Sequence, residues 1–120
     1  MEIPKIFDSE YRFCLILWQN EPVGSTKLVS LCKEELGWSK ATTYTVIRRL
    51  AERGVLKNEN AVVTSLVSKD DVQQSEVEQL VDKTFEGSIP AFIAAFSRSK
   101  KLTEEELAQL QDLIDSYHNS

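Results

Sequence analysis

The chain has 120 residues, of which 42% are hydrophobic and 28% charged, and its formal net charge is −5 at pH 7. These values are typical of a globular protein with one domain, or with one small domain and an appendage. No apolar run approaches the roughly 20 residues that span a bilayer, so we expect no membrane insertion. We expect a cytoplasmic protein, since residues 1–13 also lack the apolar segment of a signal peptide.

Histidine and cysteine, which many enzymes and metal sites use, are scarce in this chain. Cys14 and Cys32 each fall within an apolar helical pattern, which favours two small buried side chains over a disulfide or a metal pair. His118 is the only histidine, and the four glycines are scattered singly instead of forming a phosphate-binding loop. We therefore predict that the chain is not an enzyme and binds no metal or other cofactor.

Charge is distributed unevenly along the chain. Residues 1–66 hold nine Lys and Arg against eight Asp and Glu, a net charge of +1, whereas residues 67–120 hold five against eleven, a net charge of −6. This division fits a nucleic-acid-binding module followed by a protein-binding module.

The first predicted helix begins at Asp8, a candidate N-cap, and ends near Asn20. Apolar residues recur in it at i, i+3, i+4 and i+7, the spacing of a stripe that faces a core. The residues of this stripe are Tyr11, Cys14, Leu15 and Trp18.

A second helix follows a turn that contains Pro22 and Gly24. Ser25 or Thr26 can open this helix, and Gly37 closes it. Its predicted inner face consists of Leu28, Leu31, Cys32 and Leu36.

A third helix is predicted between Ser39, a plausible N-cap, and Gly54, a plausible terminator. Only Trp38 and Ser39 separate it from the second helix, which predicts a helix-turn-helix. One face carries Thr43, Val46, Ile47 and Leu50, and the other carries Thr42, Thr45, Arg49 and Arg53. Short hydroxyls and guanidinium groups suit a DNA major groove, although an ordinary solvated face has the same polarity.

Two short β-prone segments, residues 55–57 and 62–66, flank the polar sequence Asn58-Glu59-Asn60 and predict a small hairpin. Three helices followed by a hairpin is the element order of a winged helix. This wing carries Lys57 but no arginine, so we expect it to contribute modestly to phosphate binding.

Three further helices are predicted in the second half. Ser68 with Asp71 can cap the first, residues 86–88 interrupt it, Pro90 lies in the first turn of the next, and Thr103 with Glu106 opens the last. Such a region has too small a core to be stable alone, which favours pairing with a second copy, although folding back onto the first half is the alternative. The residues predicted for dimerisation are Leu80, Phe85, Ile89, Phe92, Ile93, Phe96, Leu107, Leu110 and Ile114, and Tyr117 continues the last apolar stripe.

These elements predict a mostly α fold with a small β-hairpin. Residues 1–67 would form a winged helix-turn-helix DNA-binding domain, and residues 68–120 a three-helix dimerisation region. An alternative from another functional class is a winged-helix protein-interaction module without specific DNA binding, which docks a partner through the acidic helical tail. Low basicity and the poor wing favour this alternative.

Three segments together resemble the BlaI/MecI/CopY family of penicillinase repressors: DSEYRFCLILW, WSKATTYTVIRRLAERGVL, and KTFEGSIPAFIAAFS followed by LTEEELAQLQDLI. The resemblance implies a homodimeric winged-helix repressor that binds an inverted-repeat operator in double-stranded DNA. The family's DNA-reading positions fall on Ala41, Thr42, Thr45 and Arg49, with Ala41 in place of a lysine. Tyr44 also replaces the usual amide, so the operator preference should differ. The predicted DNA-binding residues are Lys40, Ala41, Thr42, Tyr44, Thr45, Arg48, Arg49 and Lys57.

The resemblance also bears on how the repressor is released. In penicillinase and methicillin-resistance members, a membrane sensor-protease system leads to cleavage between an asparagine and a phenylalanine of the fifth helix. Ala95 and Phe96 occupy that place here, so half of the dipeptide is missing and release by proteolysis stays open. Copper-responsive members use Cys-x-Cys pairs near the C-terminus, and this tail contains no cysteine.

Overall fold

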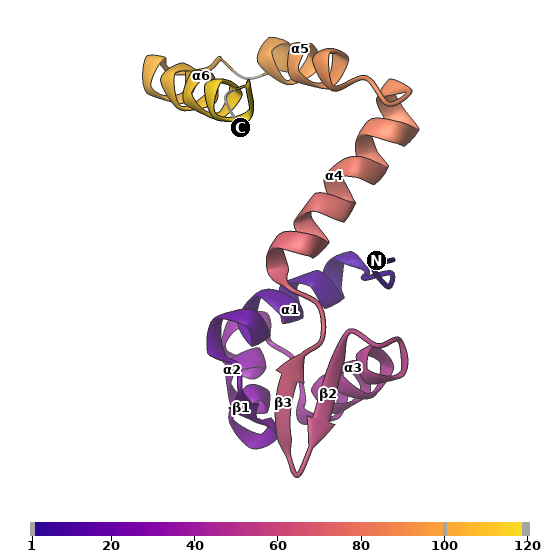
Figure 1. The fold of residues 1–120 in the computed structure, drawn as a ribbon. Helices are drawn as coiled ribbons and strands as arrows, with labels where there is room; N and C mark the ends of the chain where they lie inside the picture. Colours follow the sequence, from indigo (N-terminus) through magenta and orange to yellow (C-terminus); the bar gives the residue numbers. More distant parts are fainter. Residues whose placement is uncertain (1, 100, 119–120) are drawn as a thin grey trace. The chain divides into compact units, whose positions relative to one another are not determined.

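The computed structural model describes residues 2–99 and 101–118. Within them the chain forms three strands and six helices (Figure 1). In chain order the elements are α1 (Asp8–Asn20), β1 (Val23–Gly24), α2 (Ser25–Leu36), α3 (Lys40–Glu52), β2 (Leu56–Glu59), β3 (Val62–Ser65), α4 (Lys69–Phe85), α5 (Ile89–Ser99) and α6 (Glu104–His118). The predicted fold class, mostly α with a winged helix-turn-helix, is confirmed.

The chain divides into two compact units, Met1–Glu76 and Val77–Ser120. Helix α4 begins in the first unit and ends in the second.

The start of α1 differs from the prediction. Phe7 is the N-cap residue and Asp8 is already helical; the carboxylate of Glu10 accepts the Phe7 backbone N–H at 2.9 Å. The buried stripe of the helix also lies one residue earlier than predicted, on Glu10, Phe13, Cys14 and Leu17, while Leu15 is exposed. All residues from 13 to 18 are apolar, so two stripes satisfy the helical spacing and the pattern alone does not select one.

Helix α2 ends as the sequence predicts. Gly37 adopts the left-handed conformation with φ of 71°, and its N–H donates to the Lys33 carbonyl at 3.1 Å. Leu28 and Cys32 are fully buried on its inner face. Burial raises the pKa of the Cys32 thiol to about 11 and that of Cys14 to about 12, so both behave as small apolar side chains.

The wing is one part of a three-stranded antiparallel sheet with the order β1-β3-β2. Asn60 and Ala61, with φ of 54° and 61°, form the two-residue turn between β2 and β3. The hairpin is therefore confirmed, but its turn lies later than predicted, because Asn58 and Glu59 pair with β3 as part of β2. The strand β1 was not predicted. This strand has two residues and exists because Val23 and Gly24 pair with Val63 and Val62, a long-range contact without a local sequence signal.

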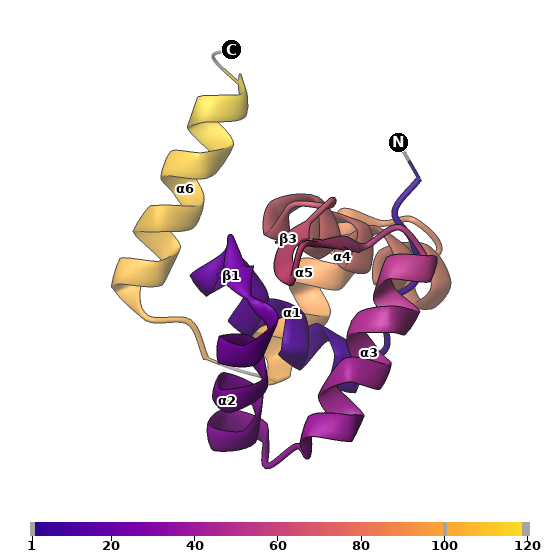
Figure 2. The same cartoon turned by 90° about the horizontal axis from the view of Figure 1, so that it is seen from below.

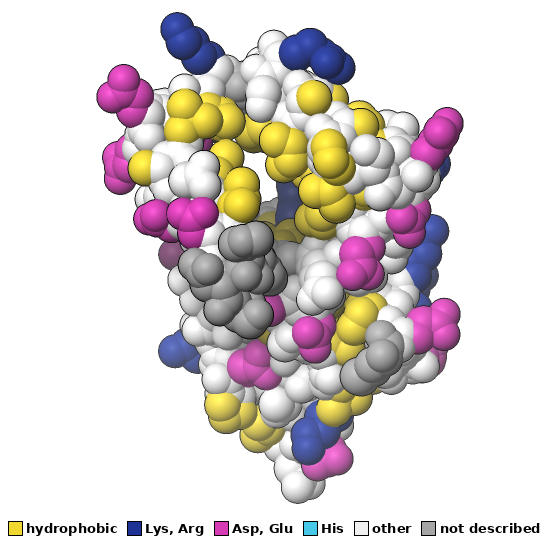
Figure 3. All heavy atoms as spheres, turned by 45° about the horizontal axis from the view of Figure 1, so that its top comes forward, with side chains coloured by type: hydrophobic (Ala, Val, Ile, Leu, Met, Phe, Trp, Pro, Cys, Tyr) yellow, Lys and Arg dark blue, Asp and Glu magenta, His cyan; other side chains and the backbone are white. Residues whose placement is uncertain are grey.

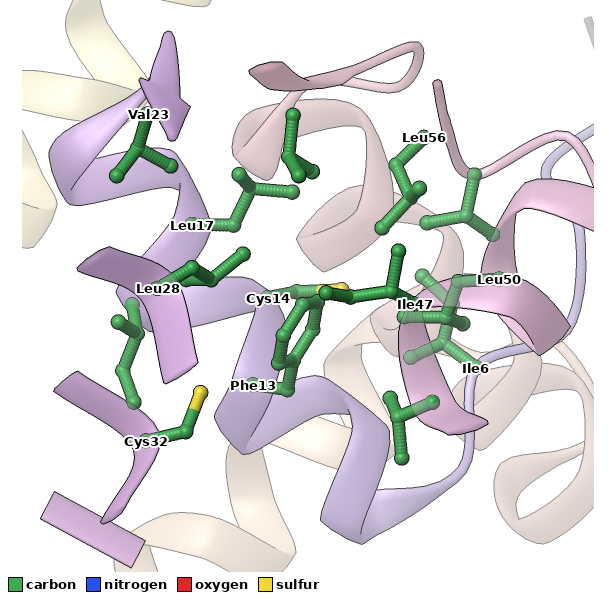
Figure 4. Close-up of a cluster of buried hydrophobic side chains, with 14 of the residues drawn as sticks. Ile6, Phe13, Cys14, Leu17, Val23, Leu28, Cys32, Ile47, Leu50 and Leu56 are labelled. Atoms are coloured by element: carbon green, nitrogen blue, oxygen red, sulfur yellow. The ribbon is translucent and has the colours of Figure 1, made fainter. Parts of the chain in front are cut away.

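A hydrophobic cluster joins α1, α2 and α3 to the sheet (Figure 4). Phe13, Leu17, Leu28 and Leu50 are fully buried within it, and burying each such side chain contributes about 1.5–3 kcal/mol. The Trp18 indole N–H donates to the Val67 carbonyl at 3.0 Å, which ties α1 to the segment before α4.

The caps predicted for the second half are present. Ser68 Oγ accepts the Asp71 N–H at 3.0 Å. Thr103 and Glu106 form a reciprocal capping box, with bonds of 3.0 and 3.1 Å between each side chain and the other's backbone N–H. Between α4 and α5 the backbone turns at Glu86 and Gly87, which have φ of 52° and 82°. The Tyr117 side chain lies outside the described residues.

Candidate nucleic-acid interface

Helix α3 is held between α2 and the wing, and it contacts both α2 and β2. Figure 2 shows α2 and α3 joined by a short turn. The Phe13 and Trp38 rings stack with centroids 6.1 Å apart, which fixes the turn against α1. Three residues, Gly37, Trp38 and Ser39, connect α2 to α3, one more than predicted. The orientation of α3 therefore depends on the hydrophobic core and on this short connection.

The buried face of α3 is as predicted from the helical spacing, and its polar face is as predicted except for Arg53. Thr43, Val46, Ile47 and Leu50 are buried. Lys40, Ala41, Thr42, Arg48 and Arg49 are exposed, while Tyr44 and Thr45 are half-buried. The α3 residues predicted to bind DNA are thus exposed or half-buried within the first unit.

Thr42 retains a hydrogen-bond donor. Its Oγ1 lies 3.0 Å from Ser39 Oγ, which also accepts the Thr42 backbone N–H at 3.1 Å and so caps the helix. Since the Ser39 hydroxyl donates to Thr42, the Thr42 hydroxyl proton remains available for another acceptor.

Tyr44 extends toward the start of α2. Its hydroxyl lies 3.4 Å from Ser25 Oγ, and its ring packs against the edge of the core. The Ser25 backbone N–H donates to the Ala61 carbonyl at the tip of the wing at 2.8 Å. Tyr44 thus stands beside the point where α2 and the wing meet.

Arg53 does not belong to the exposed face to which the helical pattern assigned it. Its guanidinium forms a two-pronged ion pair with Glu10 of α1 and donates to the Lys5 carbonyl at 2.8 Å. This contact was missed because Glu10 is a charged residue in a helix whose predicted inner stripe was apolar. The one available signal was the position of Glu10, three residues after Phe7, where Glu commonly accepts the N-cap N–H.

The wing offers little free positive charge. Lys57 Nζ lies 3.9 Å from Glu59 Oε2, and both side chains are well exposed. A surface ion pair of this kind is weak, but it places a carboxylate beside the cation that would approach the DNA backbone.

The apolar residues predicted for dimerisation are poorly covered in the single chain. None of the nine is buried: Phe85, Phe92 and Leu110 are half-buried, and the other six are exposed. Ile89 and Ile114 are 55% and 60% exposed, and hydrophobic side chains lie uncovered at the surface in Figure 3. Exposed apolar side chains in this number are typical of an interaction surface.

Two further findings concern sites of other kinds. No helix in the described part of the chain has the length and hydropathy that crossing a membrane requires. Among residues 2–99 and 101–118, no three His, Cys, Asp or Glu side chains are grouped so that they could hold a metal ion.

Comparisons with known proteins agree with this geometry. A 16.5 kDa protein of Latilactobacillus sakei, described as uncharacterized and encoded in the ptsI 3′ region, is 27% identical over 118 residues, which cover 92% of this chain and 78% of the relative. The solution structure of the monomeric form of Bacillus licheniformis BlaI, in complex with the blaP half-operator, is similar with a TM-score of 0.51 and 24% identity. That match covers 58% of this chain and 90% of BlaI's.

The likeness to BlaI supports the winged-helix fold. The sequence model of the penicillinase repressor family matches residues 6–116, which include every predicted DNA-binding and dimerisation residue. The chain therefore belongs to the penicillinase repressor family of DNA-binding transcriptional repressors.

Proposed function

We propose that the chain is a homodimeric repressor that binds an inverted-repeat operator with α3 in the major groove. The observation that carries this proposal is the exposed polar face of α3, which follows a three-residue turn and lies beside a β-hairpin. Such a helix can enter a groove about 12 Å wide without steric conflict, because its outward side chains are short or flexible. The BlaI structure adds support, since it holds a half-operator.

The proposed contacts differ in kind. Arg49 and the Thr42 and Thr45 hydroxyls would read base edges, while Lys40, Arg48 and Lys57 would bind phosphates. Ala41 would give an apolar contact such as one to a thymine methyl group, and Tyr44 would set the distance between α3 and the start of α2. These assignments predict an operator preference specific to this chain.

The second half of the proposal is dimerisation through residues 68–120, with residues 1–67 binding DNA. The exposed apolar side chains of α4, α5 and α6 support it, because a second copy would remove them from water. A two-fold dimer presents two α3 helices to two half-sites, and this matches a palindromic operator.

The release mechanism that we propose to test first is proteolysis at Ala95–Phe96 through a membrane sensor-protease system. Ala95 is half-buried and Phe96 exposed within α5, so cleavage would require local opening of this helix. An intact chain after exposure of the cells to the inducer would exclude this route. We also propose that the repressor acts in the cytoplasm, where its operator lies.

Selection from a random duplex pool tests the DNA-binding function. We expect the full chain to enrich an inverted repeat and to bind it with an affinity that falls linearly with the logarithm of salt concentration. Failure to enrich any sequence, with no complex even at low salt, would refute the proposal. It would favour a winged-helix protein-interaction module that docks a partner through the acidic tail.

A further inference from the structure

The end of the recognition helix is tied to the N-terminal arm, which comprises residues 2–7. Arg53, the residue after α3, donates from Nη1 to the Lys5 carbonyl at 2.8 Å and to Glu10 Oε1 at 2.9 Å, and from Nη2 to Glu10 Oε2. Its guanidinium also lies 5.4 Å from the centre of the Phe7 ring. One side chain thus joins α3 to the arm and to the first turn of α1.

Glu10 is an unusual residue for the buried side of α1, because only 5% of its surface is exposed. Burial raises the pKa of its carboxyl, but the hydrogen bonds from Arg53 and Phe7 and the charges of Arg53 and Arg49 outweigh it, so the pKa is lowered. The carboxylate is therefore ionised at neutral pH, with both of its oxygens bonded to Arg53.

Arg53 follows Arg49 by four residues, the spacing that would place the two side chains on one side of the helix if Arg53 had no partner. A guanidinium that has no partner within the protein can bind a phosphate whatever the base sequence. An unpaired Arg53 one turn after Arg49 would therefore add affinity for any DNA. The pairing with Glu10 withdraws Arg53 from that role, while Arg49 one turn earlier stays exposed.

We propose that Glu10 is a positioning residue of the DNA interface, because it holds Arg53 against the N-terminal arm. Of the two arginines Arg49 and Arg53, only Arg49 is then presented to DNA. The proposal rests on the DNA-binding function proposed above. It assigns to Glu10 an effect on specificity, although Glu10 itself contacts no DNA.

The Glu10→Gln variant tests the proposal on the full chain, with the selected operator duplex and a scrambled duplex as probes in a salt series. We expect the released Arg53 to bind one further phosphate, which would steepen the slope of log affinity against log salt by about 0.9. Binding to the scrambled duplex should tighten more than binding to the operator, so the ratio of the two affinities should fall.

Two further variants separate this role from a merely structural one. Asp8→Asn removes the same charge from an exposed residue of the same helical turn and should leave the slope unchanged. The double variant Glu10→Gln with Arg53→Gln has no arginine to release, so it should restore the wild-type slope and affinity ratio. This expectation also holds if Glu10→Gln alone folds poorly, because the double variant leaves no unpaired charge at the site.

The outcomes distinguish the two proposals. A wild-type chain that binds no operator refutes the DNA-binding function, and the role of Glu10 with it. If the wild-type chain binds its operator, two results would refute the role of Glu10 alone. One is a salt slope of Glu10→Gln equal to that of the wild type, and the other is a salt slope of the double variant as steep as that of Glu10→Gln.

Discussion

The hydroxyl of Ser39 accepts the backbone N–H of Thr42 at 3.1 Å and lies 3.0 Å from the Thr42 hydroxyl, to which it donates. One side chain therefore both caps α3 and orients a residue that we assign to DNA reading. We therefore expect a substitution of Ser39 to affect both the stability of the fold and DNA binding.

Replacing Ser39 with alanine should lower the free energy of unfolding by about 1 kcal/mol, because the N-cap bond is lost. Operator affinity should also fall, since Thr42 would no longer be held in one rotamer. Urea denaturation and binding measurements check the two effects. Ser30→Ala, on an exposed position of α2, is the control and should lower neither, because alanine favours a helix interior more than serine does. An unchanged stability of Ser39→Ala would show that the cap contributes nothing.

Replacing Arg49 with alanine should weaken operator binding by about 1–3 kcal/mol, the range for a bidentate contact to a base. Binding to a scrambled duplex should weaken less. Arg12→Ala removes the same charge from an exposed position of α1 and should preserve the preference for the operator. An equal loss on both duplexes for Arg49→Ala would make this residue a phosphate anchor instead of a base reader.

Replacing Glu59 with glutamine should increase DNA affinity about twofold to fivefold, or about 0.5–1 kcal/mol. The substitution removes the carboxylate that lies 3.9 Å from Lys57 Nζ and leaves this cation to bind phosphate. The increase should disappear at high salt. Lys57→Gln should have the opposite effect, and if neither variant changes affinity, the wing does not contact DNA.

Replacing Ile93 with aspartate should abolish the dimer, because the charge would be buried against the second copy at a cost of several kcal/mol. Sedimentation at micromolar concentration measures the effect. Leu66→Asp places the same charge on an exposed apolar residue of the first unit and should leave the dimer intact. A wild-type chain that sediments as a monomer would refute dimerisation.

The Glu10–Arg53 pair should make stability depend on pH in the acidic range. The pKa of Glu10 lies below its ordinary value of 4.5 in the folded chain. The pair therefore stabilises the fold above pH 4.5, and this stabilisation is lost as the pH falls through the lowered pKa. The difference in unfolding free energy between wild type and Glu10→Gln, about 1–3 kcal/mol at pH 7, should shrink toward pH 3. A constant difference would contradict the cause given for the lowered pKa.

Sequence reasoning located α3 well because its signals are local. Ser39 caps the helix, Gly37 and Gly54 have positive φ, and the core face repeats at helical spacing. The missed features depend on contacts between distant residues: β1 exists because it pairs with β3, and Arg53 is withdrawn from the surface by Glu10, 43 residues earlier. In α1 all residues from 13 to 18 are apolar, so the sequence pattern does not determine which side of the helix is buried. Packing against the rest of the fold determines it.

Chemical interference on the selected operator tests the central claim, that α3 reads the major groove, most directly. Methylation of guanine N7 and replacement of thymine by uracil alter groups found in the major groove. We predict two clusters of interfering positions, one in each half-site, whose centres are separated by about one helical turn of 10–10.5 base pairs or a multiple of it. Full affinity for duplexes modified at every major-groove position would contradict the account.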